Sequence, residues 1–189
     1  FGEAKGIRAR PIAMRNFQSE MRRALAIYND AWSDNWGFVP ITEREADDVI
    51  ATFRMVIRPE MVVLGQIDGE IQGIHIALPN VNELIFDLGG RLFPFGWAKL
   101  LWRLRRRPPT TVRVALVGVA KHLRASHRAG AMVSATLLRL VEAVKEAGFA
   151  FADLSWIFED NEASLAFPRA LNGRLAKIYR LYAKEIGPT

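Results

Sequence analysis

Val112-Arg113-Val114-Ala115-Leu116-Val117-Gly118-Val119 is an apolar run rich in β-branched residues, which is typical of a buried strand. A short basic turn follows it, Ala120-Lys121-His122-Leu123-Arg124-Ala125-Ser126-His127-Arg128. The next predicted element is a helix from about Ala129 to Ala147, with Gly148 as its C-cap. Its predicted core-facing stripe consists of Val133, Leu137, Leu140, Val141 and Val144. Because the first N–H groups of a helix are free and its dipole adds positive potential, the turn is a predicted anion site, with phosphate as the first candidate.

Local signals predict further elements on both sides of this unit. Asp68-Gly69 between two apolar runs is a strong hairpin signal, and Thr42-Glu43-Arg44-Glu45 has the form of a capping box. The predicted strands are Ile7–Ala13, Met61–Ile67, Glu70–Leu78, Phe149–Phe158 and Arg174–Lys184. The predicted helices are Glu20–Asp34 with Ser19 as its N-cap, Thr42 to a residue before Pro59, Phe95–Arg106, and Asn161–Leu171, which contains Pro168.

The order of these elements predicts an α/β fold in one domain, residues 1–189. Strand, long helix and strand at the centre imply a right-handed parallel crossover. The earlier hairpin adds antiparallel strands, so the sheet is expected to be mixed, mostly antiparallel and flanked by helices. The pattern excludes a doubly wound fold.

Positive charge is concentrated in one stretch of a chain whose net charge is +6. Between Leu88 and Val141 there is no acidic residue, whereas the rest of the chain carries 15 basic and 20 acidic residues. The basic residues of this stretch are Arg91, Lys99, Arg103, Arg105, Arg106, Arg107, Arg113, Lys121, Arg124, Arg128 and Arg139. Localised charge indicates an anionic partner; a solvated basic face beside an arginine-rich loop is the alternative.

Composition narrows the class of protein. The chain has no cysteine, which excludes disulfides and cysteine chemistry and fits a cytoplasmic location. No run approaches the ~18 apolar residues of a membrane-spanning helix. Three scattered histidines without cysteine argue against a metal site. His75, on a hairpin strand, is interpreted as a satisfied core histidine, with a place in an acceptor pocket as the alternative.

The element order and local motifs resemble the GCN5-related N-acetyltransferase (GNAT) superfamily over most of the chain. In that superfamily the turn between the fourth strand and third helix reads Arg/Gln-x-x-Gly-x-Gly/Ala. Arg124-Ala125-Ser126-His127-Arg128-Ala129 matches it, except that His127 replaces the first Gly. Longer strings resemble one bacterial branch: residues 27–32, 35–40, 90–95 and 155–161. Members of that branch are often about twice this length, so the chain, which begins at Phe1, is interpreted as the C-terminal acetyltransferase-like half of a longer protein.

The resemblance implies a fold and a cofactor, acetyl-coenzyme A (acetyl-CoA). Backbone amides of the turn from Arg124 to Ala129, through Ala125, Ser126, His127 and Arg128, would hold its pyrophosphate. Val117 and Val119 would supply the strand edge that pairs with the pantetheine arm. Asn161 matches the superfamily's Asn that contacts the same arm. His127 narrows the approach to the amides, because a Cβ obstructs an anion that must come close to the backbone.

Acetyl transfer to an amine also needs a base and an acid for the leaving thiolate. Glu159 is the predicted base, although an N-capping role explains Glu159 and Asp160 equally well. The superfamily's Tyr falls seven residues after Asn161, where this chain has Pro168. Tyr179 is the predicted substitute, with a core or cross-strand tyrosine as the alternative.

These observations predict an acyl-CoA-dependent N-acyltransferase, acting on a small-molecule or other amine. The first alternative is a degenerate, catalytically inactive GNAT-fold binding module, because His127 and Pro168 both stand at functional positions. Peripheral membrane contact is a further hypothesis, since residues 93–107 pair aromatic and aliphatic side chains with a polybasic end. No recognition motif supports nucleic-acid binding. The acceptor and the oligomeric state are not predicted.

Overall fold

The computed structural model describes residues 6–107, 109–124, 126–180, 182 and 184. The chain divides into two compact units, Phe1–Ser155 and Trp156–Thr189, and each is described by itself. The first unit contains the sheet and most of the helices, and the described residues of the second unit form one helix. The prediction of a single domain stays a prediction.

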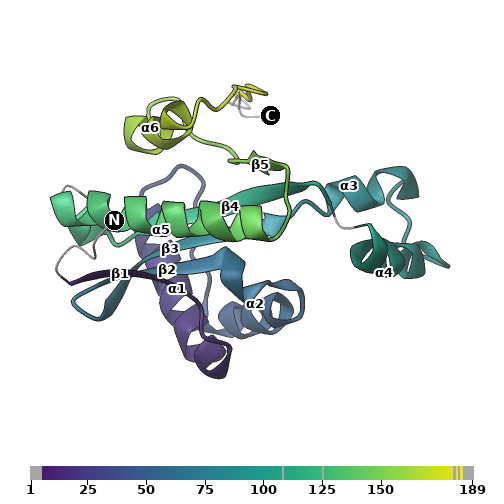
Figure 1. Cartoon of the computed structure of the whole chain (residues 1–189), viewed down its shortest axis with the longest axis horizontal. Coiled ribbons are helices and arrows are strands. Elements are labelled where there is room, and N and C mark those ends of the chain that lie inside the picture. Colours follow the sequence, from purple (N-terminus) through teal and green to yellow (C-terminus); the bar gives the residue numbers. More distant parts are fainter. Residues whose placement is uncertain (1–5, 108, 125, 181, 183, 185–189) are drawn as a thin grey trace, which may run out of the picture. The chain divides into compact units, whose positions relative to one another are not determined.

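The first unit is built on one five-stranded sheet with the order β1-β2-β3-β4-β5 (Figure 1). Three strand pairs are antiparallel, and only β4 and β5 run parallel. The strands are β1 (Ile7–Pro11), β2 (Val62–Ile67), β3 (Glu70–Pro79), β4 (Thr111–Val119) and β5 (Phe151–Asp153). The predicted mixed, mostly antiparallel sheet is therefore confirmed.

Helices cover both faces of this sheet. Helices α1 (Phe17–Trp32) and α2 (Glu43–Val56) share a buried core with Leu64 and Ile74 of the sheet. On the opposite face, Val63 packs in a core with residues of α5 (His127–Glu146). Because successive strand residues point to opposite faces, neighbouring Val63 and Leu64 bury their side chains under different helices.

Several short elements connect these layers. The 3₁₀ turns are η1 (Met14–Asn16), η2 (Pro59–Met61), η3 (Phe86–Leu88) and η4 (Lys121–Leu123). Helices α3 (Asn82–Ile85) and α4 (Gly96–Arg106) lie between β3 and β4 in the chain. The second unit contains α6 (Glu162–Ala170), with Pro168 inside it.

Helix α5 approaches the sheet closely because two glycines lie beneath it. A Cβ built on Gly65 would lie 2.7 Å from Met132 Cγ, and one on Gly73 would lie 2.6 Å from Met132 Cε. Met132 itself is fully buried. Missing side chains on β2 and β3 thus make room for this methionine, and the contact sets the height of α5 above the sheet.

Two details at the helices differ from expectation. The N-cap of α1 is Asn16, and Ser19 lies inside the helix, where its hydroxyl donates to the Asn16 carbonyl at 2.9 Å. The buried stripe of α5 includes Leu137 and Leu140 as predicted, but its other buried members are Ala129, Met132, Thr136 and Ala143. Ala129, Thr136 and Ala143 are short side chains in this stripe, which lets α5 lie close to the sheet. The predicted capping box at Thr42 is present.

The two predicted strands near the C-terminus are corrected. The strand expected over 149–158 is only β5, and its first two residues are exposed. The predicted strand Arg174–Lys184 is wrong: its described residues, 174–180, 182 and 184, adopt no strand. Leu175, Ile178 and Tyr179 are spaced by three and one residues, so an extended strand would not place them on one face.

Candidate active site

Strand β4 has one edge paired with β3, and its opposite edge is unpaired over most of its length. Strand β4 pairs with β3 from Val112 to Val119. It pairs with β5 only from Thr111 to Arg113. Among the residues that the structure describes, no strand occupies the other edge of 114–119, and Val117 is 40% exposed. This leaves a gap in the sheet where an extended ligand could add as a strand.

Backbone hydrogen-bond alternation shows which residues serve this open edge. The Ala120 N–H donates to the Gln72 carbonyl at 2.9 Å, so these two residues form a hydrogen-bonded pair. In an antiparallel ladder every second residue bonds to the neighbouring strand, which gives Gly118 and Leu116 the same role. The N–H and C=O groups of Val117 and Val119 therefore point away from β3, toward the open edge.

A bulge lies where β4 leaves β5. The register between β3 and β4 shifts at Ile76 and Ala77, which pair with Leu116 and Val114, so Ala115 is the extra residue. A bulge bends its strand and increases the local twist. It therefore helps to turn the second half of β4 away from β5. Sequence reasoning missed it, because no glycine or proline stands at this position.

The basic turn after β4 is tied to the end of α1. The Lys121 N–H donates to Asp30 Oδ2 at 2.7 Å, and its ammonium group lies 2.6 Å from Asp34 Oδ2. The hydrogen bond from Lys121 holds the pKa of Asp34 below its usual value. The Arg124 guanidinium donates to the Ala31 carbonyl. Two of the basic side chains expected to bind an anion at the turn, Lys121 and Arg124, thus contact other parts of the protein instead.

The amides at the start of α5 are only partly engaged. Ser126 is the N-cap, and its hydroxyl accepts from the Ala129 N–H at 3.1 Å. The Ser126 N–H donates to the Leu123 carbonyl at 2.8 Å. The His127 and Arg128 N–H groups have no acceptor within the described part of the chain. Ala125 lies outside the described residues.

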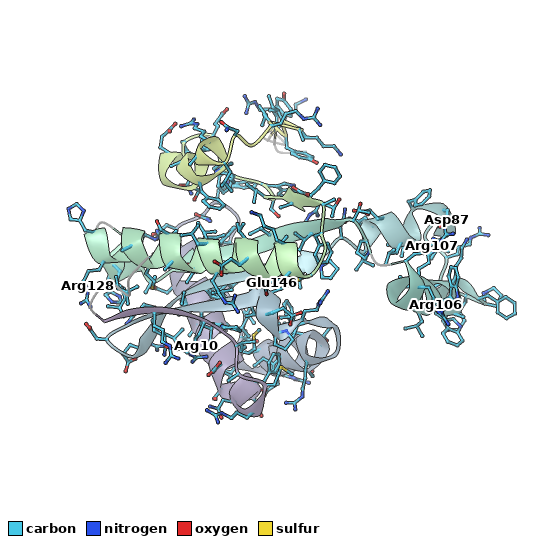
Figure 2. All side chains as sticks on the ribbon, viewed as in Figure 1. Arg10, Asp87, Arg106, Arg107, Arg128 and Glu146 are labelled. Atoms are coloured by element: carbon cyan, nitrogen blue, oxygen red, sulfur yellow. The ribbon has the colours of Figure 1, made fainter. Side chains whose placement is uncertain are left out.

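Charge beside these amides is also partly balanced. The Arg128 guanidinium, labelled at the start of α5 in Figure 2, lies 2.7 Å from Asp68 Oδ1 of the hairpin turn. Hydrogen bonding and the charge of Arg128 lower the pKa of Asp68. This pair is exposed at both side chains, so an incoming anion could compete for Arg128 at little cost.

The second unit holds the other predicted site residues. Asn161 caps α6 by accepting from the Ser164 N–H at 3.0 Å. Glu159 forms an ion pair with Arg180 at 2.9 Å. The Tyr179 ring lies 5.4 Å from that of Trp156. The predicted residues thus fall into two groups: the strand edge and amides in the first unit, and Glu159, Asn161 and Tyr179 in the second.

His75 is a core histidine without hydrogen-bond partners. It is fully buried on β3, opposite Val63 on one side and Val117 on the other. Neither ring nitrogen has a partner among the described residues, so its interpretation as a satisfied histidine is wrong. Burial lowers its pKa to about 4, and the ring is neutral at pH 7. Within the described residues, no group of three or more His, Cys, Asp or Glu could hold a metal ion.

Sequence comparison finds long bacterial relatives. No protein-family model matches the chain. It is 38% identical over 186 residues to "Bacterial ceramide synthase" of Caulobacter vibrioides, a match that covers 98% of this chain and 48% of the relative. It is 37% identical over 189 residues to Protein YghO of Escherichia coli, with 96% and 47% covered. The chain thus spans about half the length of the curated relatives it matches.

Solved structures share the fold. An N-acetyltransferase from Staphylococcus aureus matches with a TM-score of 0.57 and 20% identity, over 88% of this chain and 82% of that one. The acetyltransferase AAC(6')-Iy, bound to a bisubstrate analogue that contains CoA, matches with 0.55 and 12%, over 95% and 99%. YncA from Salmonella typhimurium, solved with acetyl-CoA, matches with 0.53 and 17%, over 88% and 78%. The chain thus shares the fold of these acetyltransferases, the fold that its resemblance to the GCN5-related N-acetyltransferase superfamily predicts.

Proposed function

We propose that the chain is an acyl-CoA-dependent N-acyltransferase, which transfers an acetyl or longer acyl group to an amine. The observation that carries the proposal is the open edge of β4, where Val117 and Val119 direct their backbone groups away from β3. The residues fit an extended ligand with amide groups, because such a ligand can form strand-like hydrogen bonds with this edge. The pantetheine arm of CoA is a ligand of this kind.

The start of α5 fits the other end of the same cofactor. The His127 and Arg128 amides and the helix dipole favour a diphosphate there. Arg128 adds a guanidinium group, which in this structure forms an exposed ion pair with Asp68. When bound, acyl-CoA supplies an activated thioester for attack by an amine.

The catalytic residues are proposed from the resemblance. Glu159 would take the proton from the acceptor amine, Tyr179 would give a proton to the departing thiolate, and Asn161 would contact the cofactor arm. The Oδ1 atom of Asn161 already caps α6, so its amide group is the part left to bind a ligand. Glu159 would have to work beside Arg180, which contacts one of its carboxylate oxygens.

The name of one relative bears on which amine accepts the acyl group. A ceramide is an amide of a fatty acid with a long-chain amino alcohol. The name of the Caulobacter relative is therefore that of an enzyme that forms an N-acyl bond. This supports N-acyl transfer over O-acyl transfer, and it makes a long-chain amine and a fatty acyl group the first combination to test beside acetyl.

A non-catalytic binding module is the second candidate. Ser126 already caps the Ala129 amide, Arg124 is bonded to the Ala31 carbonyl, and Pro168 lies inside α6 where the superfamily has Tyr. The first two features reduce the groups available to hold the cofactor diphosphate, and the third removes the superfamily's proton donor. Such a module would bind CoA and transfer nothing.

Two measurements on the full chain separate these functions. Calorimetry with acetyl-CoA and with a long-chain acyl-CoA should detect one site per chain. Release of free CoA thiol should then rise when amines are added, with long-chain amino alcohols tested beside short amines. Binding without thiol release from any amine would favour the module. No heat at millimolar cofactor would overturn both functions.

A further inference from the structure

One part of the first unit stands apart from the sheet. Residues 82–107, here called the excursion, comprise α3, η3 and α4 and connect β3 to β4. Figure 1 shows α3 and α4 beyond the ends of these strands rather than over either face of the sheet. The excursion is therefore not needed to cover the core, and its side chains are available for another purpose.

Polar contacts hold the excursion in place from within. Glu83 accepts hydrogen bonds from the N–H and hydroxyl of Thr110, at 2.8 and 3.0 Å, which ties it to the start of β4. Asp87 accepts from Lys99 at 2.6 Å and from Arg103 at 2.5 and 2.8 Å. Asp87 thus joins η3 to α4, and hydrogen bonds from Arg103 and Lys99 lower its pKa strongly. Both carboxylates are therefore engaged by other residues of the protein.

Large apolar side chains of the excursion are exposed instead. Phe86, Phe93 and Phe95 are 80%, 83% and 77% exposed. The aromatic patch consists of Phe86, Leu92, Phe93, Phe95, Trp97, Leu101 and Trp102, each at least 45% exposed. Exposed apolar groups at this density mark an interaction surface.

The same segment carries positive charge without a counter-charge. Arg91, Arg106 and Arg107 are exposed, and none has an acidic partner within the described residues. Figure 2 labels Arg106 and Arg107. Lys99 and Arg103 both contact Asp87, whose single negative charge balances one of the two. No other acidic residue lies between Leu88 and Val141 in the sequence to balance the remaining arginines.

We propose that the excursion docks the chain on the surface of an anionic lipid bilayer. Trp and Phe are suited to the boundary between headgroups and acyl chains, and arginines beside them attract anionic headgroups. None of the described helices is long and apolar enough to cross a membrane. The contact is therefore peripheral, with the aromatic patch inserted and Arg91, Arg106 and Arg107 at the headgroups. It is independent of acyl transfer.

Vesicle flotation of the full chain tests this directly. Vesicles of phosphatidylcholine mixed with phosphatidylglycerol should carry the protein upward at low salt, and pure phosphatidylcholine vesicles should carry much less. Phe93→Ser with Phe95→Ser should weaken binding at least tenfold, because two aromatic side chains that insert among the lipids are lost. Arg106→Glu with Arg107→Glu should weaken binding at least tenfold, because two charges that attract anionic headgroups become charges that repel them.

Matched controls lie outside the excursion. Trp36→Ser removes an aromatic group that is 76% exposed, and Arg44→Glu reverses an exposed charge. Both should leave flotation unchanged, and circular dichroism should show that all variants fold. No flotation with anionic vesicles at low salt would overturn the proposal. So would equal losses in the controls, or a concentration-dependent dimer in ultracentrifugation that Phe93→Ser with Phe95→Ser abolishes, because a second copy would then cover the patch.

Discussion

The two edges of β4 differ although one apolar sequence forms both. The edge toward β3 is hydrogen-bonded along the strand, and it adjoins His75 and the close contact of Met132 with Gly73. The other edge is paired only as far as Arg113. At the closed edge, side-chain packing therefore limits which substitutions the fold accepts. At the open edge, backbone N–H and C=O groups are free to bind a ligand. Substitutions near the closed edge should change stability, and those at the open edge should change ligand binding.

The largest expected effect is at His75, beside the closed edge. The unfolded chain binds a proton here near pH 6.5, whereas the folded chain does so only near pH 4. The effect of His75 alone therefore leaves the free energy of unfolding unchanged above about pH 6.5. Below that pH, protonation of the unfolded chain lowers this free energy by up to about 3 kcal/mol as the pH drops toward 4. Urea unfolding across this range should show that the parent loses more stability than His75→Leu as the pH falls, because leucine has no group to protonate. Parallel pH curves would contradict the account.

Gly65→Ala tests the packing beneath α5. The new Cβ would meet Met132 Cγ at 2.7 Å and Thr136 Cγ2 at 3.0 Å. Such overpacking should lower the free energy of unfolding by about 1–3 kcal/mol. The matched control is Gly130→Ala on exposed α5, where nothing lies within 4 Å of the new Cβ, and it should raise stability by about 0.5–1 kcal/mol. Equal effects in thermal unfolding would contradict the close approach of α5.

Val117→Pro tests the open edge. Proline lacks an N–H, but that of Val117 points away from β3, so the ladder should survive. Affinity for acetyl-CoA should fall about tenfold, the equivalent of one hydrogen bond. Val117→Ala keeps the N–H and should bind as the parent does. Calorimetry decides; a variant with unchanged affinity would show that the cofactor does not pair with this edge.

The smallest effect is expected at Ser126. Ser126→Ala removes the N-cap of α5 and should cost about 1 kcal/mol of stability. It also frees the Ala129 amide for a diphosphate. The loss measured by thermal unfolding should therefore shrink when CoA is present in excess. A loss of the same size with and without CoA would indicate that the diphosphate does not bind here.

Local signals explain what the sequence could predict. The hairpin follows from Asp68 and Gly69, whose φ angles of +53° and +87° suit these residue types in a tight turn. The capping box at Thr42 is equally local. Both depend on residues within a few positions of one another, and both are confirmed.

The missed features depend on contacts that are distant in sequence. The bulge at Ala115 arises from pairing with β3, and the engagement of Arg124 requires Ala31 of α1. The length of β4 that stays unpaired depends on where β5 ends. The sequence of β4 itself does not indicate that point. For the site, Val117 and Val119 lie at the open edge, and the predicted roles of these two residues and of Glu159, Asn161 and Tyr179 all stay predictions.

Amide hydrogen exchange at β4 tests the central claim most directly. Without ligand, the Val117 and Val119 amides should exchange fast, and those of Leu116 and Gly118, bonded to β3, should be protected. Saturating acetyl-CoA should protect Val117 and Val119 and leave the other two unchanged. Val117 and Val119 amides that are already protected without ligand, or that stay fast with it, would contradict the account.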